Sequence, residues 1–532
     1  MKTTARAGAL ILAVGLMCQS VAAQKPIDLD VATIADVNTA FAKGTLTSER
    51  LTQMFLSRID AYDRKGPALR SVITVNPRAL EQARAMDAER KAKGPRSALH
   101  GIPIVLKDNI DTADLPTTGG SILLEGALPP DDAFVVKRLR AAGAVIVAKV
   151  NLSEFASGAA HSSLGGQILN PHDLTRTPSG SSGGTGASIA AAFAMAGLGT
   201  DTGGSVRGPS TANGIAGLKT TMGLVSRDGV IPLALSFDTV GPMARHVYDV
   251  AAMLSIIAGV DAADPSTTAG DGRAVADYTQ SLRRDALKGA RLGVARDFMG
   301  QDGDVDWVME ASLDAMRQQG ATIVDVRLPR WLLEAKGEYY NAIRYPEFVV
   351  QIADYLKTLD AKYPKTIAEL IERARRINAP GANGASPNPV RWSLMVRESN
   401  SGTMNDYQYT SVRDHALPLV RAVLNGLLAA DKLDAIVYPT ASRRPAMIAA
   451  PAEVPGGAAG SGSNLANLSG FPELIVPAGF TTEDLPVGIS ILGPAFSEAR
   501  LLALGYSFEQ ATRARRLPVH TPLRSGESIA VP

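Results

Sequence analysis

Seven short apolar runs constrain the fold of this chain more than any other feature of its sequence. They are GIPIVLK (101–107), AVIVAKV (144–150), RLGVA (291–295), ATIVDV (321–326), DAIVYPT (434–440), LIVPAGF (474–480) and GISILG (488–493). Runs of this length, separated by segments with helical periodicity, indicate buried strands. The sequence therefore predicts an α/β fold in which helices cover both faces of a central sheet.

The first 23 residues have the plan of a secretory signal peptide. Lys2 and Arg6 precede an apolar run over residues 7–17, and small residues lead up to Ala23. Cleavage after Ala23 would place the mature chain in the periplasm or outside the cell. The alternative is an uncleaved anchor. No later stretch approaches the roughly 20 apolar residues that span a bilayer, so we expect no membrane association after the signal is removed.

Composition argues against several classes of protein. The chain has 54 Lys and Arg against 52 Asp and Glu, and loss of Lys2 and Arg6 makes the two counts equal. Nothing in this balance indicates a nucleic-acid partner. Cys18, the only cysteine, lies in the signal, so the mature chain has no disulfide and no cysteine metal site. The six histidines lack zinc spacing, although His161 or His172 could line a site.

Two groups of aspartates have to be tested as metal sites. Asp302, Asp304 and Asp306 have the spacing of a calcium loop, but tryptophan at 307 replaces the required glycine and leucine at 313 replaces the required glutamate. Asp108 and Asp111 flank the end of a predicted strand, where aspartates more often accept hydrogen bonds from backbone N–H groups. We expect no metal and no organic cofactor.

Aromatic residues concentrate in the second half of the chain. Ten of the 27 lie between Trp331 and Tyr409. We predict that about 331–425 form a helical, cap-like insertion that faces the substrate. Trp331, Tyr340 and Trp392 are the candidates to contact an aryl, acyl or peptide group there.

Glycine and serine crowd into TPSGSSGGTGAS (177–188) and TDTGGSVRGPS (200–210). The first stretch is not a phosphate-binding P-loop, because no lysine follows its glycines. Gly180, Ser182 and Gly184 fit the G-x-S-x-G nucleophile elbow, but the residues before them are polar and include two prolines rather than a strand.

A third interpretation joins both stretches to Lys107. With GIPIVLKDNIDT at 101–112, GSSGG at 180–184 and DTGGSVR at 201–207, the chain resembles the amidase signature family, most closely its peptide-amidase branch. The motif core is 101–245, and the amidase domain is expected over 28–525. The resemblance implies a single large α/β/α domain with a mixed sheet.

The resemblance also implies a Ser-cisSer-Lys triad. Ser205 would attack an acyl carbon, Ser181 would relay the proton, and Lys107 would act as the base. Ser181 would follow a cis peptide bond. For Lys107 to accept a proton, burial must lower its pKa by a few units from about 10.4.

Further roles follow from the same motif. The backbone N–H groups of Thr202, Gly203, Gly204 and Ser205 would form the oxyanion hole. Asp201 and Arg207 would stabilise the loop as an ion pair, and Ser182 would hold it by hydrogen bonds. These three residues could equally well serve only to satisfy the hydrogen-bonding groups of an ordinary loop. The chain departs from many members at Ser179, where they have glycine, and in GLKTT (217–221), where they have GLKPT.

The predicted function is hydrolysis of a small amide or short peptide amide through an acyl-Ser205 intermediate, by a monomer or homodimer. An esterase would use the same mechanism. Two other functions remain open: the A-type subunit of a glutamyl-tRNA amidotransferase, and a secreted, non-catalytic solute-binding protein of two α/β lobes.

Overall fold

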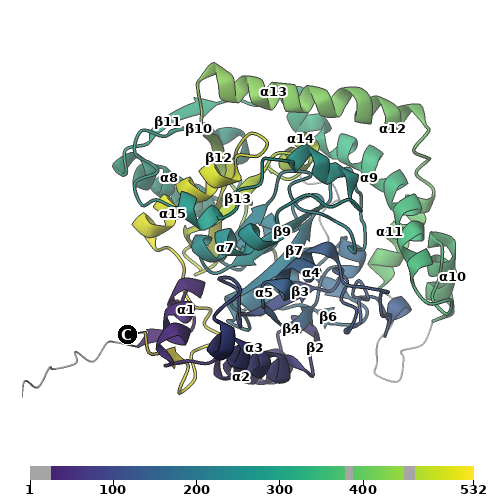
Figure 1. Cartoon of the computed structure of the whole chain (residues 1–532). Helices are drawn as coiled ribbons and strands as arrows, with labels where there is room; N and C mark the ends of the chain where they lie inside the picture. The colour runs from purple at the N-terminus through teal and green to yellow at the C-terminus, as the bar shows by residue number, and fades with distance from the viewer. Residues whose placement is uncertain (1–25, 378–387, 449–461, 532) are drawn as a thin grey trace, which may run out of the picture.

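The computed structural model describes residues 26–377, 388–448 and 462–531 (Figure 1). The predicted signal peptide lies outside these residues. One mixed sheet of eleven strands forms the centre of this part of the chain. In spatial order its strands are β11 (Thr322–Val326), β10 (Arg291–Ala295), β12 (Ala435–Pro439), β14 (Pro486–Leu492), β13 (Glu473–Phe480), β8 (Ala216–Lys219), β9 (Thr239–Ala244), β7 (Ala196–Asp201), β3 (Pro103–Lys107), β4 (Val145–Val150) and β2 (Val72–Val75).

Two short strand pairs lie outside the sheet. In one, β1 (Ile27–Asp28) pairs with β15 (Ser528–Ile529), so the two ends of the described chain lie together. In the other, β5 (His161–Ser162) pairs with β6 (Gly166–Gln167).

All seven apolar runs form strands of this sheet. Six of them are buried as predicted, but β11 is an edge strand whose Thr322 and Asp325 are exposed, because it has a neighbour on one side only. Four strands were not predicted: β2, β7, β8 and β9. Glycine and alanine make up half of AGLGTD and of AGLK, and Thr200 is the one β-branched residue in β7 and β8, so neither has the Val- and Ile-rich pattern that marks a strand.

Helices cover both faces, which the side-chain alternation of β3 shows directly. Ile104 and Leu106 pack in one core cluster with Val250 and Leu254 of α7 (Val247–Ile257). Val105, between them, packs in another cluster with Ile189 of α5 (Gly183–Ala190). Successive side chains of a strand point to opposite faces, so Lys107 is on the same side as Val105, facing α5.

The helices carry the following bounds. They are α1 (Ile34–Lys43), α2 (Ser48–Arg58), α3 (Ala79–Lys93), α4 (Phe134–Ala141), α5 (Gly183–Ala190), α6 (Arg207–Ala212), α7 (Val247–Ile257), α8 (Gly303–Gln318), α9 (Arg330–Thr358), α10 (Ile367–Arg376), α11 (Pro389–Ser399), α12 (Tyr407–Ser411), α13 (Leu417–Ala430), α14 (Leu465–Ser469) and α15 (Glu498–Thr512). None of the helices in the described ranges is long and apolar enough to cross a membrane.

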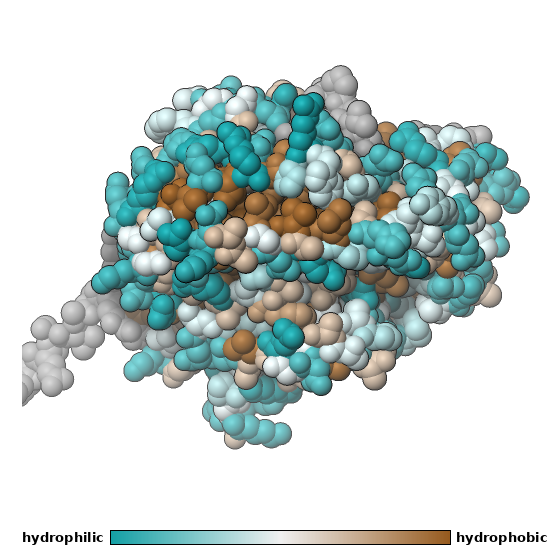
Figure 2. All heavy atoms as spheres, turned by 90° about the horizontal axis from the view of Figure 1, so that it is seen from above, coloured by the Kyte–Doolittle hydropathy of each residue, from teal (hydrophilic) through white to brown (hydrophobic). Residues whose placement is uncertain are grey.

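The aromatic segment forms α9 to α13, which run along one side and across one end of the sheet (Figure 1). Figure 2 looks down on that end and shows apolar residues gathered there. Several of the aromatic side chains anchor these helices to the rest of the fold: Tyr355 donates a hydrogen bond of 2.8 Å to Asp111, and Tyr363 donates one of 3.1 Å to the carbonyl of Glu125.

A buried charge cluster joins α9 to α11. The carboxylate of Glu398 on α11 accepts hydrogen bonds from Arg344 of α9 and, at 2.8 Å, from Arg391 of its own helix. All three side chains are almost fully buried. Such a cluster is stable only while each charge keeps its partner.

We expect Glu398→Gln to lower the free energy of unfolding by about 3–5 kcal/mol, because two buried guanidinium groups lose their carboxylate. Urea unfolding followed by tryptophan fluorescence measures this loss. Glu334→Gln is the matched control, since Glu334 pairs with Arg330 on the exposed face of α9 and its loss should cost less than about 1 kcal/mol. Equal losses in the two variants would contradict a buried, structural role for the cluster.

Candidate active site

Lys107 lies at the end of β3 and is fully buried. Its Nζ donates hydrogen bonds of 2.7 Å to Ser181 Oγ and 2.8 Å to Thr200 Oγ1. Thr200 Oγ1 also accepts a hydrogen bond from Asn109 at 3.0 Å. The amine is therefore aimed at Ser181 by a fixed set of neighbours.

Burial lowers the pKa of Lys107 from its usual value to about 7. The cause is desolvation, which disfavours the charged amine, and the nearby carboxylates of Asp201 and Asp238 oppose it only in part. Near neutral pH a substantial fraction of this amine is uncharged and able to accept a proton.

The two serines of the GSSGG stretch have different surroundings. The peptide bond between Gly180 and Ser181 is cis, as the family resemblance implies. Ser182 is fully buried, and its hydroxyl bonds to both the carbonyl (3.2 Å) and the N–H (3.3 Å) of Thr200. A hydroxyl held in this way inside the protein cannot reach a substrate, which argues against the nucleophile elbow at Ser182.

Ser179 stands where many members of the family have glycine, and its backbone conformation gives the reason for that glycine. Its φ is +61°, in the left-handed region that glycine adopts most easily. A glycine at this position in many members would adopt the same backbone with less strain. Here the serine takes that conformation and its side chain lies beside Gly208 at the start of α6.

The loop from β7 to α6 is built around Asp201. Its carboxylate accepts hydrogen bonds of 2.9 Å from the N–H groups of Gly204 and Val206 and pairs with Arg207 at 3.1 Å. Burial opposes ionisation, but the charge of Arg207 outweighs it and holds the pKa of Asp201 below its usual range. The predicted Asp201–Arg207 pair is present, and it shapes the turn that presents Ser205.

Three of the four backbone groups predicted for the oxyanion hole remain available. Within the described chain, no hydrogen bond occupies the N–H groups of Thr202, Gly203 or Ser205. The prediction for Gly204 needs a correction, because its N–H is taken by Asp201. Gly204 contributes its backbone shape instead, with a φ of +128° that favours glycine.

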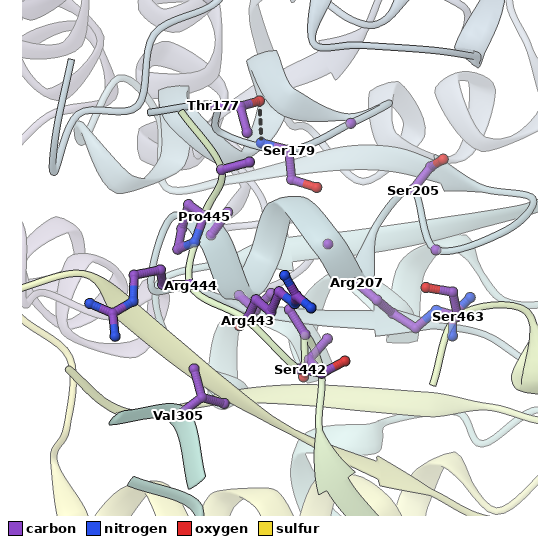
Figure 3. Close-up of a pocket in the computed structure, with 18 of the residues that line it drawn as sticks. Thr177, Ser179, Ser205, Arg207, Val305, Ser442, Arg443, Arg444, Pro445 and Ser463 are labelled. Carbon is purple, nitrogen blue, oxygen red and sulfur yellow. Dashed lines mark hydrogen bonds between the residues drawn. The ribbon is translucent and has the colours of Figure 1, made fainter. Parts of the chain in front are cut away.

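A cavity of about 720 Å³ opens beside Ser205. Its walls come from the loop before α5, the Ser205 loop, α9 and the stretch 440–446 after β12. Figure 3 shows Ser205 and Arg207 on one side of this cavity and Arg443 in its middle. Ser205 is partly exposed, whereas Ser181 and Ser182 are buried, so Ser205 is the serine that a substrate can meet.

None of the three aromatic candidates for substrate contact lines the cavity, so that contact stays a prediction; Tyr340 alone packs against the loop that carries Ser205. Tyr340 of α9 stacks on Phe237 at 5.5 Å and lies against Gly203, so close that a Cβ there would meet its hydroxyl at 2.8 Å. Trp331 and Trp392 do not line the cavity. Trp392 is partly buried against a core cluster in which α9, α10 and α11 pack on residues from outside the insertion, such as Leu124 and Phe155.

The histidine and aspartate candidates have structural roles. Neither His161 nor His172 lines the cavity. Asp302 caps α8 and pairs with Arg444 at 2.7 Å, while Asp108 lies 3.2 Å from Lys149. In the described ranges no three His, Cys, Asp or Glu side chains are grouped as a metal site would require.

Sequence reasoning missed the residues that hold Arg207 from the far side. Glu473 of β13 accepts a hydrogen bond from Arg207 at 2.6 Å, and Asn467 of α14 bonds to both Arg207 and Asp201. Thr200, which receives the Lys107 amine, was missed as well. Only Thr200 lies inside a recognised motif and could have been suspected.

A solvent-accessible serine beside a buried lysine–serine pair and three open backbone N–H groups has the geometry of a serine-nucleophile hydrolase. Known proteins agree. The chain matches the Amidase family over residues 50–502. It is 36% identical over 500 residues to the A-type subunit of the glutamyl-tRNA(Gln) amidotransferase of Halorhodospira halophila, covering 90% of this chain and 97% of that protein.

Two further relatives belong to the same family. A probable amidase of Arabidopsis thaliana is 34% identical over 530 residues, covering 96% of this chain and 95% of that protein. The solved structure of peptide amidase from Stenotrophomonas maltophilia superposes with a TM-score of 0.81 at 39% identity, covering 92% of this chain and 99% of that chain. The protein is therefore a member of the amidase family.

We expect kcat/KM for an uncharged amide to rise with pH through a midpoint near 7, the pKa of Lys107, because only the neutral amine accepts a proton. Stopped assays of ammonia release from pH 5 to 9 measure the profile. Lys219→Met is the control: burial also lowers the pKa of Lys219 to about 7, but its Nζ donates a hydrogen bond to the carbonyl of Phe471. Loss of the midpoint in this variant, rather than in Lys107→Ala, would assign the titration to Lys219.

Gly203→Ala should lower kcat by about 100-fold, the typical effect of disturbing one oxyanion donor, because the new Cβ collides with Tyr340 and moves the loop. Steady-state kinetics on one amide measure the loss. Gly426→Ala on α13, where a Cβ meets nothing within 4 Å, should keep the wild-type kcat. A wild-type kcat in Gly203→Ala would show that this loop does not hold the oxyanion.

Proposed function

We propose that this member of the amidase family hydrolyses the C–N bond of a carboxylic amide through an acyl intermediate on Ser205. The observation that carries the proposal is the buried 2.7 Å hydrogen bond between Lys107 and Ser181, next to a loop that exposes Ser205 to a cavity. The N–H of Ser182 donates a hydrogen bond of 3.1 Å to the carbonyl of Ser205, which keeps this serine next to the Lys107–Ser181 pair.

In the acylation step, Ser181 takes the proton of Ser205 as the neutral Lys107 takes the proton of Ser181. The Ser205 oxygen bonds to the acyl carbon, and the N–H groups of Thr202, Gly203 and Ser205 stabilise the negative carbonyl oxygen. The hydroxyl of Ser181 is already engaged by Lys107. Its bond to Ser205 is expected to form with substrate, because catalytic hydrogen bonds often tighten only in the enzyme–substrate complex.

The tetrahedral intermediate formed by this attack then breaks down to the acyl intermediate. Lys107 returns a proton through Ser181 to the leaving nitrogen, the C–N bond breaks, and ammonia or an amine departs. Water then bonds to the acyl carbon as its proton passes through Ser181 to Lys107. The same path returns a proton to the Ser205 oxygen as the acyl–oxygen bond breaks, which releases the carboxylic acid and restores both serines.

Short peptide amides are the proposed substrate class. The solved relative with 39% identity is a peptide amidase, and it matches this chain over nearly its whole length. A cavity of about 720 Å³ is within the usual range for small-molecule sites and accommodates a dipeptide amide. Esters of similar size would react by the same steps.

A transamidating subunit is the second candidate, favoured by the 36% identity to the corresponding part of a glutamyl-tRNA(Gln) amidotransferase. Such a protein would release ammonia for use by a partner. The solute-binding alternative required two α/β lobes, and the single eleven-strand sheet of the described chain does not provide them.

We also propose that residues 1–23 direct export and are removed. The support is the basic start, the apolar run and the small residues before Gln24. A mature, exported enzyme would act on amides in the periplasm or the medium.

The test is intact-mass analysis of protein purified after expression of the full chain, before and after reaction with a fluorophosphonate. Wild type should gain one adduct, while Ser205→Ala should gain none and Lys107→Ala should react far more slowly, because its serine is no longer activated. The mass before reaction also shows whether residues 1–23 have been removed.

Release of ammonia from acetyl-Met-Phe-NH2 by the purified chain alone would favour the hydrolase over the transamidating function. Adduct formation without turnover of any amide would favour the transamidating function. Full labelling of Ser205→Ala would disprove the assignment of the nucleophile.

A further inference from the structure

Three arginines line the cavity beside Ser205: Arg207, Arg443 and Arg444. Carboxylates neutralise two of them. Arg207 pairs with Asp201 and Glu473. Because these two carboxylates already neutralise its charge, the Arg207 guanidinium is not available to bind an anionic group of a substrate.

Arg444 is neutralised as completely. Its guanidinium lies 2.7 Å from Asp302, 3.1 Å from Glu483 and 3.3 Å from Asp304. Burial is slight, and the pairing with Asp302 keeps the pKa of Arg444 above its usual value. Arg444 therefore holds the wall of the cavity together.

Arg443 differs from both. Among the described residues no carboxylate lies within ion-pair distance of it, and its one hydrogen bond, of 3.3 Å, goes to the neutral amide oxygen of Gln301. Its side chain is exposed and lies in the middle of the cavity (Figure 3). It carries a positive charge over the space that a substrate of Ser205 would occupy.

The described part of the cavity wall offers this charge no carboxylate partner. None of the described lining residues is Asp or Glu, and hydroxyl groups such as those of Thr177, Ser179 and Thr440 supply further polar contacts. A guanidinium binds a carboxylate through two parallel hydrogen bonds, which is stronger and more directional than its contact with a neutral amide. A ligand that carries a carboxylate would therefore supply the counterion of Arg443.

We propose that Arg443 forms an anion subsite through which the enzyme selects amides that carry a carboxylate. The proposal rests on the function proposed above, since it concerns the substrate of Ser205. It makes Arg443 a specificity residue and leaves the chemistry of bond cleavage to Lys107, Ser181 and Ser205.

The test compares two matched pairs of substrates. Acetyl-Glu-Phe-NH2 and acetyl-Met-Phe-NH2 differ by a carboxylate on the acyl side, and the 4-carboxyanilide and 4-methylanilide of acetic acid differ by one on the leaving group. Wild type should prefer the anionic member of at least one pair by about tenfold in kcat/KM, the effect of a charge-assisted hydrogen bond. The preference should shrink as salt screens this exposed charge.

Arg443→Gln should abolish the preference, because it should lower kcat/KM for the anionic member more than for the neutral member, and Arg443→Lys should keep part of the preference. Arg330→Gln, which removes an arginine from the exposed face of α9, should leave the preference unchanged. Equal kcat/KM within both pairs in wild type, or a preference that survives Arg443→Gln, would overturn the proposal.

Binding separates this proposal from the proposed function. Calorimetry with Ser205→Ala measures the affinity for each peptide amide without turnover, and adding Arg443→Gln should weaken the binding of the glutamyl peptide more than that of the methionyl peptide. A loss of that difference with no turnover in wild type would reject the function and keep the subsite. Turnover of both peptides by wild type, with equal affinity of Ser205→Ala for the two, would keep the proposed function and reject the anion subsite.

Discussion

The buried pair of Asp201 and Arg207 is the interaction on which the site depends. Asp201 ends β7 and binds two N–H groups of the following turn, so it sets the backbone that carries Ser205. Arg207 begins α6 and extends the same network to Glu473 and Asn467. One ion pair thereby connects the middle of the sheet to β13 and α14, and the turn cannot shift without breaking charged hydrogen bonds inside the protein.

The residues that carry chemistry were predicted from the resemblance to the amidase signature family, whose motifs are local stretches of sequence. In the structure, side-chain alternation in β3 places Lys107 on the face that α5 covers, and the N–H of Ser182 donates a hydrogen bond of 3.1 Å to the carbonyl of Ser205, which holds the two glycine-rich stretches together. Strands rich in Val and Ile were predicted because their patterns are also local. The glycine-rich strands β7 and β8 were missed, since their place in the sheet depends on their neighbours.

The rest could not be predicted because it is long-range. Glu473 and Asn467 follow Arg207 by 266 and 260 positions, and no spacing rule relates them. The aromatic density of 331–409 favoured a substrate-facing cap but did not show which of these side chains pack inside the protein. Trp392 is partly buried against a core cluster, while Tyr340 lies at Gly203. The resemblance likewise could not show that Asp201 occupies the N–H of Gly204.

The Asp201–Arg207 ion pair also bears on the protonation of Lys107, the proposed base. Lys107 is useful only when uncharged, yet Asp201 raises its pKa through space while burial lowers it. An unpaired carboxylate so close would favour the ammonium form strongly in a medium of low polarity. Arg207 lies directly against Asp201, and its second charged partner is Glu473. The carboxylate that shapes the turn of Ser205 therefore also favours the charged form of the base, and it is the burial of Lys107 that outweighs this effect and lowers its pKa.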